Sequence, residues 1–101
     1  MFKLFQIIFQ GELSDIELLD IGMKLGYDIE EVAIRLGMSQ HQVQTMKLSN
    51  QQNAKTWGLN ILVSWRNEQD RGVDKRKALA DALRRSKRAD LADQVLRSQQ
   101  N

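Results

Sequence analysis

The chain has 101 residues, of which 42% are hydrophobic and 28% are charged, as expected for one globular domain with a modest core. It contains no cysteine and one histidine, which excludes disulfides and thiolate chemistry and argues against a zinc site. Residues 1–50 carry four Lys or Arg against seven acids, and residues 51–101 carry eleven against six. A chain with one acidic and one basic end can attract copies of itself or of its relatives.

The first nine residues, MFKLFQIIF, are apolar but fall short of the ~20 residues that span a bilayer. No small-residue cleavage site of a secretory signal follows them. We therefore expect residues 1–12 to be an apolar extension or a leading helical turn that packs on the core.

The first predicted helix begins after Ser14, which forms a capping box with Glu17, and it ends at Gly26. Gly22 lies inside this helix, where glycine costs roughly 1 kcal/mol relative to alanine. That cost predicts a second helix that crosses closely at this point.

Residues 28–46 predict a helix, a tight turn and a second helix. Asp28 and Ser39 are the expected N-caps, and Gly37 suits the left-handed residue that ends the first of the two helices. This pattern is typical of a DNA-binding helix-turn-helix. It is equally typical of the middle of a helical interaction domain, so the rest of the chain must decide between the two.

Three further helices are expected, at about residues 54–69, from Asp74 onward, and at residues 89–97, while residues 98–101 should fray. The second of these three carries basic residues that are expected to coat its outside: Lys75, Arg76, Lys77, Arg84 and Arg85. Helical spacing of the apolar residues gives the expected core: Leu18, Ile21, Leu25, Ile29, Val32, Ala33, Leu36, Val43, Met46, Ile61, Leu62, Trp65, Leu79, Leu83, Leu91 and Val95.

Short motifs recur in order along these helices: Leu25-Gly26; Ile29, Val32-Ala33 and Leu36-Gly37; Leu62 and Trp65; Leu79, Ala82 and Leu83; Arg88, Asp90, Leu91 and Ala92. In this order and spacing, residues 13–96 resemble a death domain, the six-helix interaction module of apoptotic and innate-immune signalling. The sequence departs from the family pattern at two places. Ile29 replaces the usual tryptophan, and Trp57 is an additional aromatic residue.

The resemblance implies an all-α fold, a six-helix antiparallel bundle with Greek-key connectivity. Residues 13–97 would be the death domain and residues 98–101 a frayed tail. It implies a cytoplasmic module, not an enzyme, that associates with other death-domain proteins or with its own copies and assembles oligomeric signalling complexes. It implies no cofactor, no metal, no small-molecule substrate and no membrane insertion.

The residues themselves offer no catalytic constellation. His41 and Ser39 lie on different helical faces and do not form a nucleophile–base pair. Glu30 and Glu31 are adjacent and therefore point about 100° apart on a helix. There is no glycine-rich phosphate loop.

Two charged surfaces are expected to make the interface. The acidic surface consists of Asp28, Glu30 and Glu31. The basic surface consists of Arg66, Arg71, Arg84, Arg85, Lys87 and Arg88. Contacts between such surfaces mainly set orientation and encounter rate. The run from Arg84 to Arg88 is open to a second interpretation, a solvated helix end whose cations favour the helix C-terminus.

Three further residues are candidates for protein contact. His41 and Gln44 lie on the polar face of the third predicted helix. Trp57 lies at the margin of the fourth, where it is either an apolar anchor of an interface or ordinary apolar surface that residues 1–9 cover.

The alternative function is DNA binding by a helix-turn-helix centred on residues 28–47. Glutamines on its second helix suit bidentate pairing with adenine. However, Glu30 and Glu31 would approach the phosphates, and only Arg35 and Lys47 flank the turn. Nucleic acid is therefore not the expected partner, because phosphate neutralisation dominates affinity for DNA.

Overall fold

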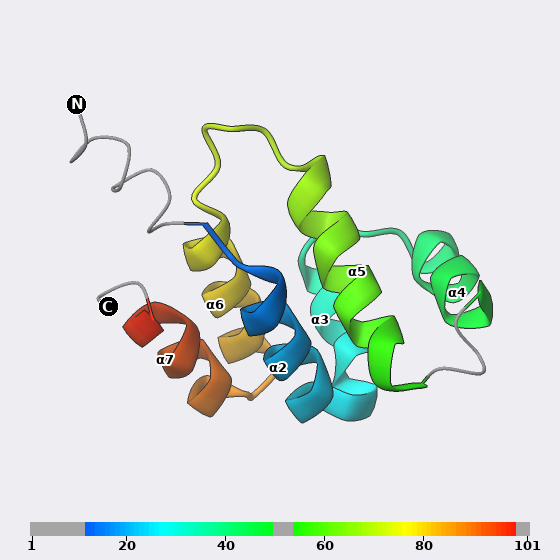
Figure 1. Cartoon of the computed structure of the whole chain (residues 1–101), viewed down its shortest axis with the longest axis horizontal. Helices are drawn as coiled ribbons and strands as arrows, with labels where there is room; N and C mark the ends of the chain where they lie inside the picture. Colours follow the sequence, from blue (N-terminus) through cyan, green and yellow to red (C-terminus); the bar gives the residue numbers. More distant parts are fainter. Residues whose placement is uncertain (1–11, 50–53, 99–101) are drawn as a thin grey trace.

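The computed structural model describes residues 12–49 and 54–98. These residues are all-α and contain no strand, which confirms the all-α part of the expected fold class. Figure 1 shows the elements in chain order: α2 (Asp15–Leu25), the 3-10 helix η1 (Gly26–Asp28), α3 (Ile29–Arg35), α4 (Gln40–Ser49), α5 (Ala54–Glu68), α6 (Lys75–Arg85) and α7 (Ala89–Ser98). The expectations for residues 1–11 and 99–101 lie outside the described residues.

Three predicted N-caps are confirmed. The backbone N–H of Glu17 donates to Ser14 Oγ at 3.2 Å, that of Gln42 donates to Ser39 Oγ at 3.0 Å, and that of Lys77 donates to an Asp74 carboxylate oxygen at 3.1 Å. Each bond satisfies a donor that the first helical turn leaves free.

The predicted N-cap at Asp28 is wrong. Asp28 has helical backbone angles at the end of η1, and its side chain makes no capping bond to α3. An N-cap needs non-helical backbone angles, which the continuous η1–α3 segment does not provide. The carboxylate binds Arg88 instead, at 3.1 Å.

The core is continuous and contains most of the expected residues. Leu36 and Met46, which were expected inside, are half-buried at its edge. Leu13 and Met38, which lie outside the helices, are buried in it. The buried apolar side chains are Leu13, Leu18, Ile21, Leu25, Ile29, Val32, Ala33, Met38, Val43, Ile61, Leu62, Trp65, Leu79, Ala80, Ala82, Leu83, Leu91, Ala92 and Val95.

The helices pack as neighbouring pairs. α2 lies beside α5, α6 beside α7, and α4 against α5, while α3 contacts α4, α5 and α6. Figure 1 shows α4 and α7 at opposite ends of the molecule, with α3 between α4 and α6.

The close helix crossing that Gly22 predicts is confirmed. A Cβ atom at Gly22 would lie 3.1 Å from the carbonyl carbon of Gly58 and 3.1 Å from the backbone nitrogen of Leu59. A Cβ atom at Gly58 would likewise lie 3.3 Å from the Cα and the carbonyl oxygen of Gly22. Two glycines therefore let α2 and α5 pack backbone to backbone.

Arg76 corrects the expected basic coat of α6, because its side chain is buried, with 1% of the residue exposed. Its guanidinium donates to both carboxylate oxygens of Glu17, at 2.7 and 3.0 Å, and to the carbonyl oxygens of Val95 and Glu12, each at 2.8 Å. Position 76 precedes Leu79 by one turn and therefore shares the inward face of α6. Its Nε is buried without a partner among the described residues.

Candidate functional site

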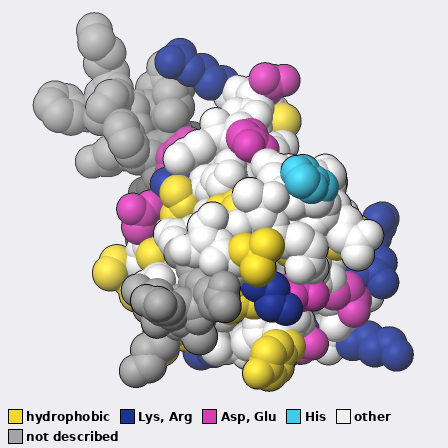
Figure 2. Space-filling model, turned by 90° about the vertical axis from the view of Figure 1, so that its right-hand side faces the viewer, with side chains coloured by type: hydrophobic (Ala, Val, Ile, Leu, Met, Phe, Trp, Pro, Cys, Tyr) yellow, Lys and Arg dark blue, Asp and Glu magenta, His cyan; other side chains and the backbone are white. Residues whose placement is uncertain are grey.

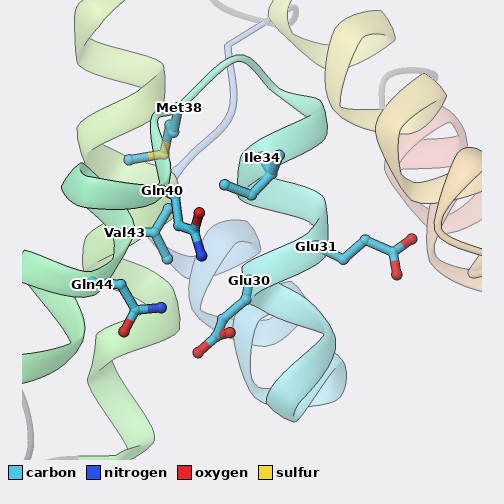
Figure 3. Close-up of a pocket in the computed structure, with 7 residues that line it drawn as sticks. All are labelled: Glu30, Glu31, Ile34, Met38, Gln40, Val43 and Gln44. Carbon is cyan, nitrogen blue, oxygen red and sulfur yellow. The ribbon is translucent and has the colours of Figure 1, made fainter.

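A groove lies between α3 and α4, with a volume of about 390 Å³. Its floor is apolar and includes Ile34, which is 45% exposed. Figure 3 shows Ile34 and Glu30 directed toward α4, whereas Glu31 points away from it. The lining residues are Glu30, Glu31, Ile34, Met38, Gln40, Val43 and Gln44. An apolar floor beside the Glu30 carboxylate suits a ligand that is both apolar and cationic.

The turn that opens this groove is fixed by Gly37, which has a φ of 98°. The N–H of Met38 donates to the carbonyl oxygen of Ala33 at 3.1 Å, and the N–H of Gly37 donates to that of Ile34 at 3.0 Å. These two bonds form a Schellman motif. The motif ends α3 and turns Met38 into the core, so that α4 starts apart from α3.

Each carboxylate of the predicted acidic surface has a basic partner within the chain. Glu30 binds Lys47 Nζ at 2.7 Å, and Glu31 binds Arg35 Nε at 3.0 Å. Asp28 binds Arg88, as described above. These pairs are solvent-exposed and therefore exchange readily for other partners, since such pairs contribute only about 0–1 kcal/mol.

The corner between α6 and α7 has the same Schellman geometry as the Gly37 turn. The N–H of Arg88 donates to the carbonyl oxygen of Leu83 at 2.8 Å, and the N–H of Lys87 donates to that of Arg84 at 3.0 Å. Here the left-handed position is occupied by Lys87, with a φ of 64°. A side chain at this position costs roughly 1–2 kcal/mol relative to the right-handed form.

The basic side chains of this corner differ in availability. Arg84 binds Asp93 at 3.0 Å, and Arg88 donates to Asp28, to Asp90 and to the carbonyl oxygen of Lys24. Arg85 and Lys87 are exposed and have no acidic partner within the described part of the chain. These two cations are thus the ones free to meet an acidic surface.

The remaining predicted basic residues lie elsewhere. Arg66, on α5, binds Asp15 at 2.7 Å and the carbonyl oxygen of Leu13 at 2.7 Å, and only 16% of its side chain is exposed. It ties the start of α2 to α5. Arg71 is exposed in the turn between α5 and α6, some distance along the chain from the α6–α7 corner.

The other candidates lie at the α4 end of the molecule. Figure 2 shows this end, with the exposed His41 in cyan, and Gln44 lines the groove. Trp57 is half-buried against the core, and Lys47 Nζ lies 5.9 Å from the centre of its ring. Trp57 thus combines core packing with a cation–π contact.

The geometry adds no support for DNA binding. Arg35 and Lys47, the two cations beside the helix-turn-helix, each lie against a glutamate, so this surface carries no excess of positive charge. Within residues 12–49 and 54–98, no cluster of side chains suits a metal ion, and no helix is long and apolar enough to cross a membrane.

Sequence reasoning missed the buried Arg76, which joins α2, α6 and α7. Its signal is the spacing of one helical turn from Leu79 and two from Leu83, which places it on the apolar stripe of α6.

The sequence model described as "Death domain" matches residues 14–99. Neither the curated proteins nor the solved structures give a match.

Proposed function

The chain belongs to the death-domain family, and from this we propose that it associates with other death domains, of its own kind or of other proteins, in apoptotic or innate-immune signalling. The family is one of protein–protein interaction modules, so the chain acts by binding and not as an enzyme. We place this action in the cytoplasm.

We propose the domain boundaries and the helix topology on the same basis. Residues 13–97 form the domain, and α2 to α7 correspond to the six antiparallel helices of the Greek-key death fold. The neighbour relations of α2 with α5 and of α6 with α7 support this assignment.

The observation that carries the proposed mechanism is the separation of two unlike surfaces. The α3–α4 groove presents the Glu30 carboxylate beside an apolar floor, and Glu31 lies on the outer side of α3. The α6–α7 corner presents Arg85 and Lys87 without acidic partners in the described chain. Figure 1 shows α3 between α4 and the α6 side of the molecule. One copy can therefore offer its corner to a second copy while its groove receives a third.

Contacts between unlike surfaces do not close as a two-fold dimer does, so they generate rings or helical assemblies. Each contact is weak, and several together bind by avidity. In our proposal Arg84 extends the basic surface, and His41, Gln44 and Trp57 border the acidic groove. Arg66 and Arg71 lie outside the corner, and Asp28 and Arg88 bind each other within one chain.

The test is a charge-reversal exchange. Glu30→Lys with Glu31→Lys forms the groove variant, and Arg85→Glu with Lys87→Glu forms the corner variant. The chain itself and a panel of purified death domains serve as binding partners, and sedimentation velocity measures association. Each variant alone should lose association at least tenfold, whereas a mixture of both variants should regain a complex.

Lys77→Glu is the matched control, because Lys77 is an exposed cation at the other end of α6. It should associate as the parent chain does, and circular dichroism should show equal helicity in all variants. Undiminished association of both reversed variants would remove the two charged surfaces from the proposal.

A further inference from the structure

The carboxylate that faces the α3–α4 groove is already bound by a cation of the same chain. Lys47 Nζ, on α4, lies 2.7 Å from Glu30 Oε1, on α3. Glu30 lines the groove, and Lys47 lies outside that lining. The ion pair therefore joins the two helices that form the groove, and it neutralises the carboxylate that a cationic partner would bind.

Lys47 also has a second partner. Its Nζ lies 5.9 Å from the centre of the Trp57 ring, on α5. This distance is within the roughly 6 Å at which a cation is attracted to the face of an aromatic ring. When Lys47 leaves Glu30, its ammonium group can thus remain over Trp57.

The pair between Lys47 and Glu30 is open to exchange. The two side chains are 47% and 36% exposed, and ion pairs with this exposure stabilise a fold only weakly. Glu31, the other carboxylate at this end of α3, is paired with Arg35. While both pairs are closed, the charges beside the groove are balanced, and the groove attracts a cation less than its two carboxylates would on their own.

The shape of the groove suits a long cationic side chain. Figure 3 shows Glu30 and Ile34 on the side of α3 that faces α4, and Gln40 and Gln44 on the side of α4 that faces α3. Glu30 and Ile34 are one helical turn apart, about 5.4 Å along the axis. Arginine and lysine lay their aliphatic stems on apolar surface and keep the charged head in a polar region. Such a side chain would cover Ile34 and bring its head to Glu30.

We propose that Lys47 is an internal competitor of the partner's cation. It occupies Glu30 in the free chain, and an incoming arginine or lysine displaces it toward Trp57. This regulation rests on the proposed function, in which the corner of a second copy supplies the cation at Arg85 or Lys87. It favours partners whose cationic side chain also covers Ile34, because a small cation gains no apolar contact in exchange for Lys47.

A small probe tests the competition without a protein partner. N-acetyl-arginine amide is titrated at low salt into the labelled full-length chain, and the NMR signals of the Ile34 methyl groups and of the Gln40 and Gln44 side-chain amides report binding. Lys47→Gln should bind the probe about two- to fivefold more tightly than the parent chain, a modest gain because exposed ion pairs are weak. Lys77→Gln removes the same charge from an exposed position at the other end of α6 and should bind the probe as the parent does.

Equal affinity of Lys47→Gln and the parent chain for the probe would overturn the proposal. Absence of probe binding in both would overturn it as well.

The ε-methylene protons of Lys47 report the displacement itself. Protons over the face of an indole ring are shifted upfield by its ring current. Binding of the probe to the parent chain should therefore move the Lys47 signal upfield, as the ammonium group leaves Glu30 for Trp57. Glu30→Gln without probe should shift the signal in the same direction. A Lys47 signal that stays in place in either experiment would contradict the displacement.

Sedimentation velocity separates this inference from the proposed function. Lys47→Gln should associate with a second copy or with a partner domain about two- to fivefold more tightly than the parent chain. If neither chain associates while the probe behaves as described, the proposed function fails and the competition at Glu30 stands. If the two chains associate equally well, the proposed function stands and the competition fails.

Discussion

Arg76 binds both carboxylate oxygens of Glu17 although the two residues are 59 positions apart. The same guanidinium also binds the carbonyl oxygens of Glu12 and Val95. One buried side chain therefore joins α2, α6, α7 and the stretch that precedes α2. The hydrogen bond from Arg76 holds the pKa of Glu17 below its usual value.

This pairing predicts acid sensitivity. A carboxyl group whose pKa is lowered by folding contributes stability above its unfolded pKa, which is ordinarily 4.5. That contribution is lost as the pH falls through the folded pKa. The free energy of unfolding, measured by urea titration from pH 7 down to pH 3, should fall less steeply below pH 4.5 in Glu17→Gln. In the control Asp81→Asn, on the exposed face of α6, the free energy of unfolding should change with pH as it does in the parent chain. The same pH dependence in Glu17→Gln would refute the linkage.

Loss of Arg76 should be among the most destabilising single changes in the chain. Arg76→Met leaves a carboxylate and two carbonyl oxygens without their donor, and we expect a loss of about 3–5 kcal/mol in the free energy of unfolding. Arg76→Lys should recover part of it, since lysine restores the charge without the bidentate geometry. The neighbouring exposed Lys77→Met should change the value by less than about 0.5 kcal/mol. Equal stability of the two methionine variants in guanidinium unfolding would rule out the anchoring role.

The α2–α5 crossing predicts an unusual response to alanine. Gly22→Ala would gain roughly 1 kcal/mol of helix propensity, but its Cβ would press on the backbone of Gly58. We expect a net loss of about 1–3 kcal/mol from overpacking, seen as a lower midpoint of thermal unfolding. Gly72→Ala, where no atom lies within 4 Å of the added Cβ, should be neutral or slightly stabilising. A higher midpoint of thermal unfolding in Gly22→Ala would mean that α2 and α5 can move apart without a loss of stability.

Two substitutions at Lys87 distinguish the effect of backbone strain on stability from the effect of the cation on association. Lys87→Gly relieves the left-handed backbone and should raise the free energy of unfolding by about 1 kcal/mol. Lys87→Ala keeps the strain and should leave it nearly unchanged. Both remove the cation, so sedimentation should show both associating more weakly than the parent chain. If association strength instead changed in parallel with the free energy of unfolding of the two variants, a direct contact by Lys87 would be excluded.

A gel-shift assay addresses the helix-turn-helix alternative. Because Glu31 and Glu30 balance the charges of Arg35 and Lys47, we expect affinity for mixed-sequence duplex DNA no tighter than the non-specific range of about 10⁻⁴–10⁻⁶ M. Tight binding that falls steeply with salt would revive that alternative.

Local signals in the sequence predicted much of the fold. Ser14, Ser39 and Asp74 each place a helix start, because an N-cap depends only on the next three residues. Gly37 and Gly22 similarly predicted a left-handed turn and a close helix crossing. These features need no knowledge of distant parts of the chain.

Local sequence signals do not predict contacts between residues that are far apart in the chain. Asp28 and Arg88 are 60 positions apart, and the predicted acidic and basic surfaces were assigned to different molecules although these two residues pair within one. Arg76 was placed outside because charged residues are seldom buried without a partner, and its partner Glu17 lies on another helix. The α3–α4 groove depends on how two helices diverge, which periodicity does not report.

At the start of α2, Arg66 of α5 and Arg76 of α6 hold the main chain as well as the side chains of Asp15 and Glu17. Arg66 and Arg76 bind the carbonyl oxygens of Leu13 and Glu12, groups that every amino acid supplies. A mechanical pull on the chain ahead of residue 12 would therefore be borne first by α5 and α6, in shear across two guanidinium groups, before it could peel α2 away from the bundle.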